Sequence, residues 1–277
     1  MIEYNGKNRK GIVISMREIV NKIKLTGKTA VVTGGHSGIG RGIVEAFAQA
    51  GAQNIVVAGR RTELGERVAA EVAAEHAVNC AFITADVTVD GDRRKLVDET
   101  VARFGRIDIL VNNAGVTHEE NAEDISYADY RKVMDLNLDA VFFLSQAAGR
   151  AMIKQGGGVI INTSSNSDRL VMTPQRQAVY NASKAGVSML TKCLAYEWAE
   201  RNIRVNAISP GYIQSDILPQ GVRADGKKFH EVWTEMIPMG RFGYAEEIGA
   251  LALFMASDIC PFLNGAVVVA DGGYHLT

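Results

Sequence analysis

Short runs of apolar residues recur along the chain, and each ends in glycine or small polar residues. A strand that is buried on both faces shows no alternation of polar and apolar side chains, so such runs indicate strands of a parallel sheet. The runs are TAVVTG (29–34), NIVVAG (54–59), CAFITAD (80–86), IDILVNNAG (107–115), GGVIINTSS (157–165), IRVNAISPG (203–211) and GAVVVADGG (265–273). We expect a strand at each of them.

Segments with apolar residues at helical spacing lie between these runs. They cover residues 42–51, 63–77, 93–105, 126–154, 178–200 and 245–256. Strands that alternate with amphipathic helices are typical of an α/β fold, in which helices cover both faces of a parallel sheet.

Polar segments directly follow the apolar runs. They are TGGHSG, GRR, ADV, NNAG, TSSNS and SPGY. Each one alone is ordinary turn chemistry. In an open parallel sheet, however, ligands bind beyond the carboxyl ends of the strands, so the recurrence of these segments predicts a binding site there.

The segment VVTGGHSGIG (31–40) fits three kinds of glycine-rich loop. A hydrolase nucleophile elbow needs glycine two residues on either side of its serine, and Ile39 breaks that pattern around Ser37. A P-loop needs lysine and then a hydroxyl, where this chain has Arg41 and Gly42. A dinucleotide-binding turn needs only a strand, a glycine-rich turn and a helix N-terminus that faces pyrophosphate. We therefore interpret the segment as a dinucleotide-binding turn with the spacing GxxxGxG, at Gly34, Gly38 and Gly40.

A second motif, YNASK (180–184), opens the helical segment after the fifth run. Tyr180 and Lys184 are four residues apart, so they share one face of that helix. A tyrosine hydroxyl keeps its proton up to about pH 10 and is a poor base at neutral pH unless the phenolate is stabilised. The ammonium of Lys184 is expected to lower the pKa of Tyr180 in this way.

The motifs TGGHSGIG, NNAG (112–115) and YNASK, in this order, resemble the short-chain dehydrogenase/reductase family. The resemblance extends from about Leu25 to the end of the chain. It implies a Rossmann-like, doubly wound parallel sheet of about seven strands in a three-layer α/β/α arrangement. It also implies a nicotinamide cofactor and hydride transfer between that cofactor and an alcohol carbon. Residues 25–277 are expected to form a single catalytic domain after an N-terminal extension, residues 1–24.

The resemblance also implies catalytic roles. Tyr180 is the expected proton donor or acceptor, Lys184 lowers its pKa and holds the nicotinamide ribose, and Asn137 supports a water relay behind the lysine. The catalytic serine is Ser165 or Ser167. The usual interval of the family to the tyrosine selects Ser167, whereas Ser165 is the serine that ends the N-x-S-S strand. We choose Ser165, which is expected to donate a hydrogen bond to the substrate oxygen.

The residues after the second strand bear on the choice of cofactor. Enzymes that use NAD usually have a carboxylate there, which binds the ribose hydroxyls and repels a 2′-phosphate. This chain has Gly59 at that position and then Arg60, whose guanidinium suits a phosphate. NADP(H) is therefore favoured, with NAD(H) as the alternative, and Arg61 and His36 are further candidates for the phosphate site.

The expected cofactor site draws on nearly all of the strand ends. Its residues are Gly34, His36, Ser37, Gly38, Ile39, Gly40, Arg60, Arg61, Asp86, Val87, Asn113, Ala114, Gly115, Tyr180, Lys184, Pro210, Gly211, Ile213 and Ser215. Within this set, the resemblance places Asp86 and Val87 at the adenine, and Ile213 and Ser215 near the nicotinamide amide.

The substrate is expected to be a small hydroxylated molecule. The segment SNSDRLVMTPQRQAVY resembles the corresponding loop of polyol and sugar dehydrogenases and ketose reductases, which indicates a sugar alcohol, ketose or sugar acid. Residues 214–240 lie where the family has a mobile substrate lid, and their proline, glycine and mixed charge fit a closing loop. Arg169 and Arg176 are candidates for binding a carboxylate or phosphate of the substrate.

Two other functions stay open. A 3-oxoacyl thioester reductase of the same family needs basic lid residues for the acyl carrier, and Lys227 and Lys228 are candidates for that role. A redox-sensing protein that binds the cofactor without turnover is the other alternative. The presence of Tyr180, Lys184 and Asn137 speaks against a sensor, which does not need a proton relay.

Composition adds limits on partners. The chain has 277 residues and a formal net charge of -1, which fits one α/β domain and disfavours nucleic acid and anionic membranes as partners. No segment approaches the roughly 18 consecutive apolar residues of a membrane span. The apolar patch GIVIS near the N-terminus is followed by charged residues and no cleavage site, so a signal peptide is not expected.

Cysteine and histidine spacing bears on compartment and metals. Cys80, Cys193 and Cys260 form no CxxC pair, which fits a reducing, cytoplasmic setting. The five histidines show neither HxxxH nor HExxH spacing, so we expect no metal site. The resemblance further implies a homotetramer, or a homodimer, in which the terminal strand takes part.

Overall fold

Seven strands form one parallel sheet in the computed structural model, which describes residues 21–214 and 229–277. They are β1 (Thr29–Thr33), β2 (Asn54–Gly59), β3 (Asn79–Thr84), β4 (Ile109–Asn112), β5 (Gly158–Thr163), β6 (Ile203–Pro210) and β7 (Val267–Ala270). The order across the sheet is β3-β2-β1-β4-β5-β6-β7, and all neighbouring pairs are parallel. The predicted strands and the doubly wound α/β architecture are confirmed.

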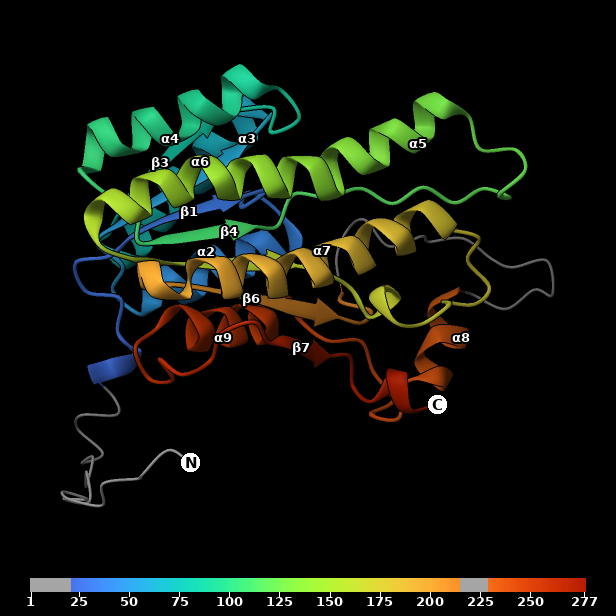
Figure 1. Ribbon diagram of the computed structural model, residues 1–277. Helices are drawn as coiled ribbons and strands as arrows, with labels where there is room; N and C mark the ends of the chain where they lie inside the picture. Colours follow the sequence, from blue (N-terminus) through green and yellow to red (C-terminus); the bar gives the residue numbers. More distant parts are fainter. Residues whose placement is uncertain (1–20, 215–228) are drawn as a thin grey trace, which may run out of the picture.

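The winding direction reverses between β1 and β4. The chain runs from β1 outward to β3 on one side and then from β4 outward to β7 on the other. The connections after β1 and β4 therefore diverge at the centre of the sheet, which is where doubly wound folds bind ligands. In Figure 1 the arrowheads of β4, β6 and β7 point to the same side, which is the side that carries α8 (Phe229–Met236).

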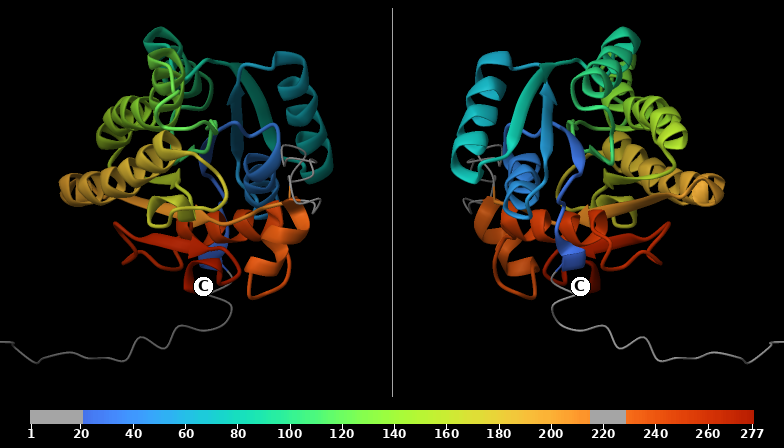
Figure 2. Two further views of the ribbon diagram at one scale, coloured as in Figure 1. Left: turned by 90° about the vertical axis from the view of Figure 1, so that its right-hand side faces the viewer. Right: turned by 90° about the vertical axis from the view of Figure 1, so that its left-hand side faces the viewer.

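Helices cover both faces of the sheet, as the views along the strands in Figure 2 show. On one face lie α2 (Gly38–Gln49), α3 (Thr62–His76) and α9 (Ala245–Ala256). On the other lie α4 (Asp90–Phe104), α6 (Ala140–Gln155) and α7 (Ala178–Trp198). Each layer buries its own apolar core against the sheet, which explains why the strands are apolar on both sides.

The predicted helix over 126–154 is interrupted. Its first part, α5 (Tyr127–Met134), is followed by a π-helical turn, η1 (Asp135–Asp139), before α6 begins. A π turn contains one more residue than an α turn. The turn buries the side chain of Asn137 completely. The predicted helix over 178–200 ends at Trp198 and continues as a short 3₁₀ turn, η3 (Ala199–Arg201).

A third apolar cluster lies at the carboxyl edge of the sheet. Its buried members are Met172, Trp233, Ile237, Phe242 and Tyr274, and they surround the partly buried Tyr212. The Tyr212 ring stacks on Trp233 at 4.7 Å between ring centroids and meets Tyr274 edge on at 5.5 Å. The cluster thereby fixes α8 and the C-terminal segment beside the strand ends.

The described part of the chain begins just before the first strand. Residues 21–23 are helical, and the backbone N–H of the buried Leu25 donates to the Ala50 carbonyl at 2.9 Å. Residues 1–20 of the predicted extension and 215–228 of the predicted lid lie outside the described residues, and so do Ser215, Lys227 and Lys228. Among the helices of the described residues, none has both the length and the apolar character to cross a membrane.

Candidate active site

A cavity of about 690 Å³ lies at the carboxyl ends of strands β1 to β6. Three of the predicted catalytic side chains, Ser165, Tyr180 and Lys184, line it. The predicted cofactor residues that also line it are Gly34, His36, Ser37, Gly38, Ile39, Arg60, Arg61, Asp86, Val87, Asn113, Ala114, Gly115, Pro210, Gly211 and Ile213. Gly40 and Asn137 lie behind the wall of the cavity rather than in it.

The turn between β1 and α2 can hold a pyrophosphate. Gly34 and Gly38 have positive φ angles of 66° and 51°, which L side chains rarely adopt. A Cβ at Gly40 would lie 2.3 Å from the Gly34 carbonyl oxygen, so only glycine fits there. The Ser37 side chain precedes α2 without capping it, which leaves the first backbone N–H groups of the helix without a side-chain acceptor. Free N–H groups at the positive end of a helix dipole suit an anion.

Arg61, and not Arg60, is held beside this turn. Its Nε donates to His36 Nε2 at 2.9 Å, and its Nη2 donates to Ser37 Oγ at 2.9 Å. The Arg60 side chain is 72% exposed, and its nearest carboxylate is Asp86 at 3.8 Å. Sequence reasoning ranked Arg60 first for the ribose phosphate. The structure brings Arg61, His36 and Ser37 together instead.

Tyr180 and Lys184 share one face of α7, as their spacing predicts. The Lys184 side chain is 4% exposed, its Nζ lies 5.7 Å from the centroid of the Tyr180 ring, and it donates to the Thr163 carbonyl at 2.8 Å. Burial lowers the pKa of Lys184 to about 8. Burial also raises the pKa of Tyr180, and the neighbouring Ser165 hydroxyl opposes that rise. The expected lowering of the Tyr180 pKa by Lys184 is therefore not seen, because burial has the largest effect on that pKa.

Ser165 and Ser167 have different surroundings. Ser165 lines the cavity beside Tyr180 and lowers the pKa of that residue, and its Oγ accepts a hydrogen bond from the Ser167 N–H at 3.2 Å. Ser167 lies in the short turn η2 (Asn166–Asp168), outside the cavity wall, and its Oγ accepts a hydrogen bond from Gln177 Nε2 at 3.3 Å. The geometry thus places Ser165 closer to the expected chemistry than Ser167.

Asn137 connects the loop after β4 to α7. Its Oδ1 accepts from the Val116 N–H at 2.9 Å, and its Nδ2 donates to the Val116 carbonyl at 2.8 Å and to Ser183 Oγ at 3.1 Å. Ser183 Oγ in turn donates to the Tyr180 carbonyl at 2.7 Å. The π turn lets Asn137 reach both segments, so its side chain fixes the position of the loop relative to the helix that carries Tyr180.

Comparison with known proteins points to one family. A family model described as "Enoyl-(Acyl carrier protein) reductase" matches residues 34–275. The chain is 40% identical over 251 residues to galactitol 2-dehydrogenase (L-tagatose-forming) from Cereibacter sphaeroides, covering 91% of this chain and 96% of the relative. It is 38% identical over 252 residues to NAD-dependent glycerol dehydrogenase from Listeria innocua, covering 91% of this chain and 95% of the relative.

A solved structure is also similar. The crystal structure of a short-chain type dehydrogenase/reductase from Mycobacterium marinum superposes with a TM-score of 0.88 at 38% identity, covering 94% of this chain and 100% of that one.

The chain belongs to the short-chain dehydrogenase/reductase family. It is accordingly an oxidoreductase that acts on CH–OH groups and uses a nicotinamide cofactor. The resemblance inferred from the three sequence motifs is confirmed.

A buried carboxylate behind Ser165 escaped the sequence analysis of this short-chain dehydrogenase/reductase. The Asp168 side chain is 2% exposed and accepts from Arg169 Nε at 2.6 Å and from Ser164 Oγ at 3.3 Å. It also accepts from Ser188 Oγ, one helical turn beyond Lys184 on α7. Ser164 Oγ also lies 3.0 Å from the Lys184 carbonyl. Asp168 thereby ties η2 to the helix that carries Lys184, and its burial depends on tertiary contacts that no local motif signals.

The two arginines proposed for a substrate anion are engaged elsewhere. Arg169 pairs with Asp168, and Arg176 donates to Asn121 on the exposed side of the loop. Neither arginine lines the cavity. Two other polar side chains, Thr117 and Tyr212, do line it, and the Tyr212 hydroxyl accepts a hydrogen bond from Gln175 Nε2 at 2.8 Å.

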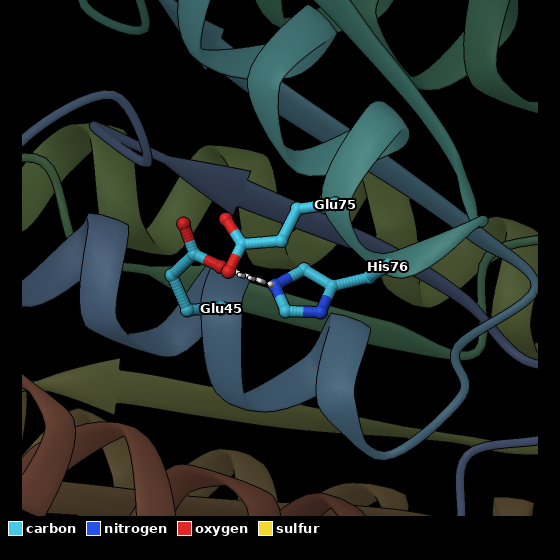
Figure 3. A group of neighbouring side chains, drawn as sticks. All are labelled: Glu45, Glu75 and His76. Atoms are coloured by element: carbon cyan, nitrogen blue, oxygen red, sulfur yellow. Dashed lines mark hydrogen bonds and ion pairs between the residues drawn. The ribbon is translucent and has the colours of Figure 1, made fainter.

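A group of possible metal ligands lies away from this site, between α2 and α3 (Figure 3). His76 Nε2 lies 2.7 Å from Glu45 Oε2 and 4.0 Å from Glu75 Oε1. These residues come from two helices and show no HxxxH spacing, so the sequence did not bring them together. Arg41 Nε donates to the second oxygen of Glu45 at 2.6 Å and compensates its charge. The contact between His76 and Glu45 joins α2 to α3.

Proposed function

We propose that this enzyme interconverts a secondary alcohol and a ketone on a polyol, a sugar or a sugar acid, and that it prefers NADP(H) to NAD(H). The observation that carries the proposal is the convergence of Ser165, Tyr180 and Lys184 on one wall of the cavity. The relatives support the substrate class, because two of them are named for galactitol and glycerol.

Proton transfer is assigned to Tyr180. In oxidation, the substrate hydroxyl gives its proton to the Tyr180 oxygen, and Ser165 donates a hydrogen bond to the same substrate oxygen as charge develops on it. In reduction, Tyr180 returns that proton to the carbonyl oxygen. The nicotinamide, when bound, accepts or supplies the hydride. Lys184 holds its positive charge against the ring and favours the phenolate form of Tyr180 while the charge is present.

The residues at the end of β2 support NADP(H). Gly59 leaves this position without a carboxylate, so nothing there repels a 2′-phosphate. Arg61 presents a guanidinium next to Ser37 Oγ and the N-terminus of α2. A guanidinium and helix N–H groups together suit a phosphate dianion. NAD(H) is the alternative, and one relative is named as NAD-dependent.

A substrate panel tests the proposal. Purified enzyme is assayed with galactitol, threitol, glycerol and gluconate, and in reduction with ketoses, each with NADP(H) and with NAD(H). We expect turnover of at least one polyol or ketose, with a higher kcat/KM for NADP(H). No turnover of any of them, together with turnover of a 3-oxoacyl thioester, overturns the substrate class in favour of the thioester reductase.

We further propose that the enzyme is a homotetramer, or a homodimer, and works in the cytoplasm. The aromatic and aliphatic side chains of Phe143 on α6 and of Met189 and Tyr196 on α7 are exposed, and β7 is an edge strand. Both features suit contacts between copies. The three cysteines are unpaired, which fits a reducing compartment.

We also propose a single catalytic domain and a substrate lid. Residues 25–277 act as one catalytic domain, and residues 214–240 act as the substrate lid. The described end of the lid supports its position, because Trp233 and Ile237 belong to the apolar cluster that surrounds Tyr212, a residue of the cavity wall. Tyr212 itself lines the cavity, so motion of this segment is able to reach the substrate.

A further inference from the structure

The imidazole of His36 has one satisfied nitrogen and one unsatisfied nitrogen. His36 is 8% exposed, and its Nε2 accepts the hydrogen bond from Arg61 Nε. Because Nε2 is the acceptor, the neutral ring carries its proton on Nδ1. Among residues 21–214 and 229–277, Nδ1 has no hydrogen-bond partner. A buried donor without a partner is costly and indicates a ligand or other group that completes the bond.

The unsatisfied edge of the ring lies at the position that governs cofactor choice. A Cβ at Gly59 would come within 2.6 Å of His36 Cε1 and 2.9 Å of Nδ1. The imidazole therefore occupies the space in which NAD enzymes of doubly wound folds place their ribose-binding carboxylate. His36 lines the same cavity as Ser37 and Arg61, so its ring is beside the expected ribose 2′ substituent.

We propose that His36 is a specificity-determining residue that takes up a proton when the 2′-phosphate of NADP binds, so that the preference for NADP over NAD strengthens as the pH falls. This inference rests on the proposed preference for NADP(H). A preference for NADP(H) alone implies neither a role for His36 nor tighter binding of NADP at lower pH.

The charges around His36 explain why the proton arrives only with the phosphate. Burial lowers the pKa of His36, and the positive charge of Arg61, before α3, lowers it further. Arg60 and Asp86, from the ends of β2 and β3, pair with each other at 3.8 Å, and β3 presents the uncharged Phe82 ring. From α2, Arg41 pairs with Glu45 and Glu71. No carboxylate is bonded to His36 among the described residues, so the imidazole is neutral until a phosphate binds.

A phosphate dianion reverses this balance. Its two negative charges offset Arg61 and leave one charge for an imidazolium, whose two N–H groups both donate. Protonation removes the acceptor at Nε2, so the Arg61 Nε–H is released from His36 and becomes available to the phosphate. The pKa of His36 therefore rises on NADP binding, and affinity is gained as the pH falls through the raised pKa.

Binding calorimetry at several pH values tests the inference without turnover. Kd values for NADP+ and NAD+ are measured from pH 6.5 to 8.5 for the wild type and for His36→Gln, which keeps an acceptor for Arg61 but cannot be protonated. At pH 7.5 the titrations are repeated in buffers of different ionisation enthalpy, which counts the protons taken up. The 2′-phosphate has its own second pKa of about 6, and the His36→Gln titration shows how much of the pH dependence arises without the imidazole.

In the wild type we expect the Kd of NADP+ to rise about five- to tenfold from pH 6.5 to 8.5, while that of NAD+ stays constant. We expect His36→Gln to remove most of this dependence and to take up about half a proton less at pH 7.5. A wild type that binds NADP+ more tightly than NAD+ but takes up no more protons with NADP+ than with NAD+ overturns the role of His36 and leaves the NADP preference intact. Equal or tighter binding of NAD+ at every pH overturns the preference itself. The wild-type comparison of the two cofactors holds even where the variant does not fold.

Discussion

The ammonium of Lys184 lies over the ring of Tyr180, 5.7 Å from its centroid, and is buried with the Thr163 carbonyl as its hydrogen-bond acceptor at 2.8 Å. A buried ammonium with a single neutral partner is destabilising when charged. The site therefore keeps a charge for catalysis at a cost to the stability of the fold, which is a common feature of active sites.

The Lys184→Met variant measures that cost. The folded pKa of Lys184 is about 8 and lies below the ordinary value of 10.5, so the unfolded chain binds more protons between these values. The lysine thus destabilises the fold fully below pH 8, and the penalty disappears as the pH rises toward 10.5. We expect Lys184→Met to be more stable than the wild type by about 1–3 kcal/mol at pH 7 and equal near pH 10.5, by urea denaturation. A variant less stable at pH 7 contradicts the buried-charge account.

The two serines after β5 are separable by mutation. Ser165→Ala removes the hydroxyl that lies beside Tyr180 in the cavity wall, so we expect kcat to fall about 10²- to 10³-fold. Ser167→Ala removes only an acceptor for Gln177, and we expect less than about a tenfold effect. Steady-state kinetics of the two variants decide the assignment, and the reverse order of effects makes Ser167 the catalytic serine.

Asp168 is expected to act as a positioning residue. Asp168→Asn removes the charge that holds Arg169 and weakens the contact with Ser188, so the turn after Ser165 loosens relative to α7. We expect a loss of about 1–3 kcal/mol in stability and a lower kcat at similar cofactor Kd. Asp98→Asn, on the exposed side of α4, is the matched control and should change neither quantity. A kcat at the wild-type level together with the lost stability limits Asp168 to a structural role.

Glu247 stabilises the start of α9 through a capping box. Its carboxylate accepts from the Tyr244 N–H at 2.8 Å and from both Nη groups of Arg241, and the Arg241 hydrogen bond is the main cause that lowers its pKa to about 2. A lowered carboxyl pKa contributes stability that is present above 4.5 and lost as the pH falls toward about 2. We expect Glu247→Gln to lower the melting temperature by about 2–4 °C at pH 7, with a smaller gap at pH 3.5. Glu246→Gln, in the same first turn, is the control, and an equal loss in both variants refutes the cap.

Much of the fold follows from the sequence because the strands are buried on both faces. The run NIVVAG coincides with β2, and its last residue, Gly59, is also the last residue of the strand. The break between α5 and α6 was missed, because a π turn preserves the apolar spacing on each side and no proline or glycine signals it. The signal at that point is Asn137, a polar residue at a position that the structure buries completely.

The site was predictable where one local motif fixes a residue and less so where tertiary contacts do. Gly34, Gly38, Tyr180 and Lys184 are set by a turn or by helical spacing, and the structure brings them to one cavity. The sequence did not show that Arg61 bonds to His36, because the direction of a side chain after β2 depends on this residue from another loop. The pairing of Arg169 with Asp168 was not predicted either, because Asp168 is buried only in the folded protein.

Tyr180→Phe tests the central claim most directly. The variant keeps the ring beneath the Lys184 ammonium and loses only the hydroxyl that transfers the proton. The measurement is kcat for the best polyol or ketose of the panel, together with the Kd of NADP+ for the same preparation. We expect kcat to fall about 10³-fold or more while the Kd is unchanged. A variant that retains wild-type turnover contradicts the assignment of proton transfer to Tyr180, and with it the mechanism proposed for this enzyme.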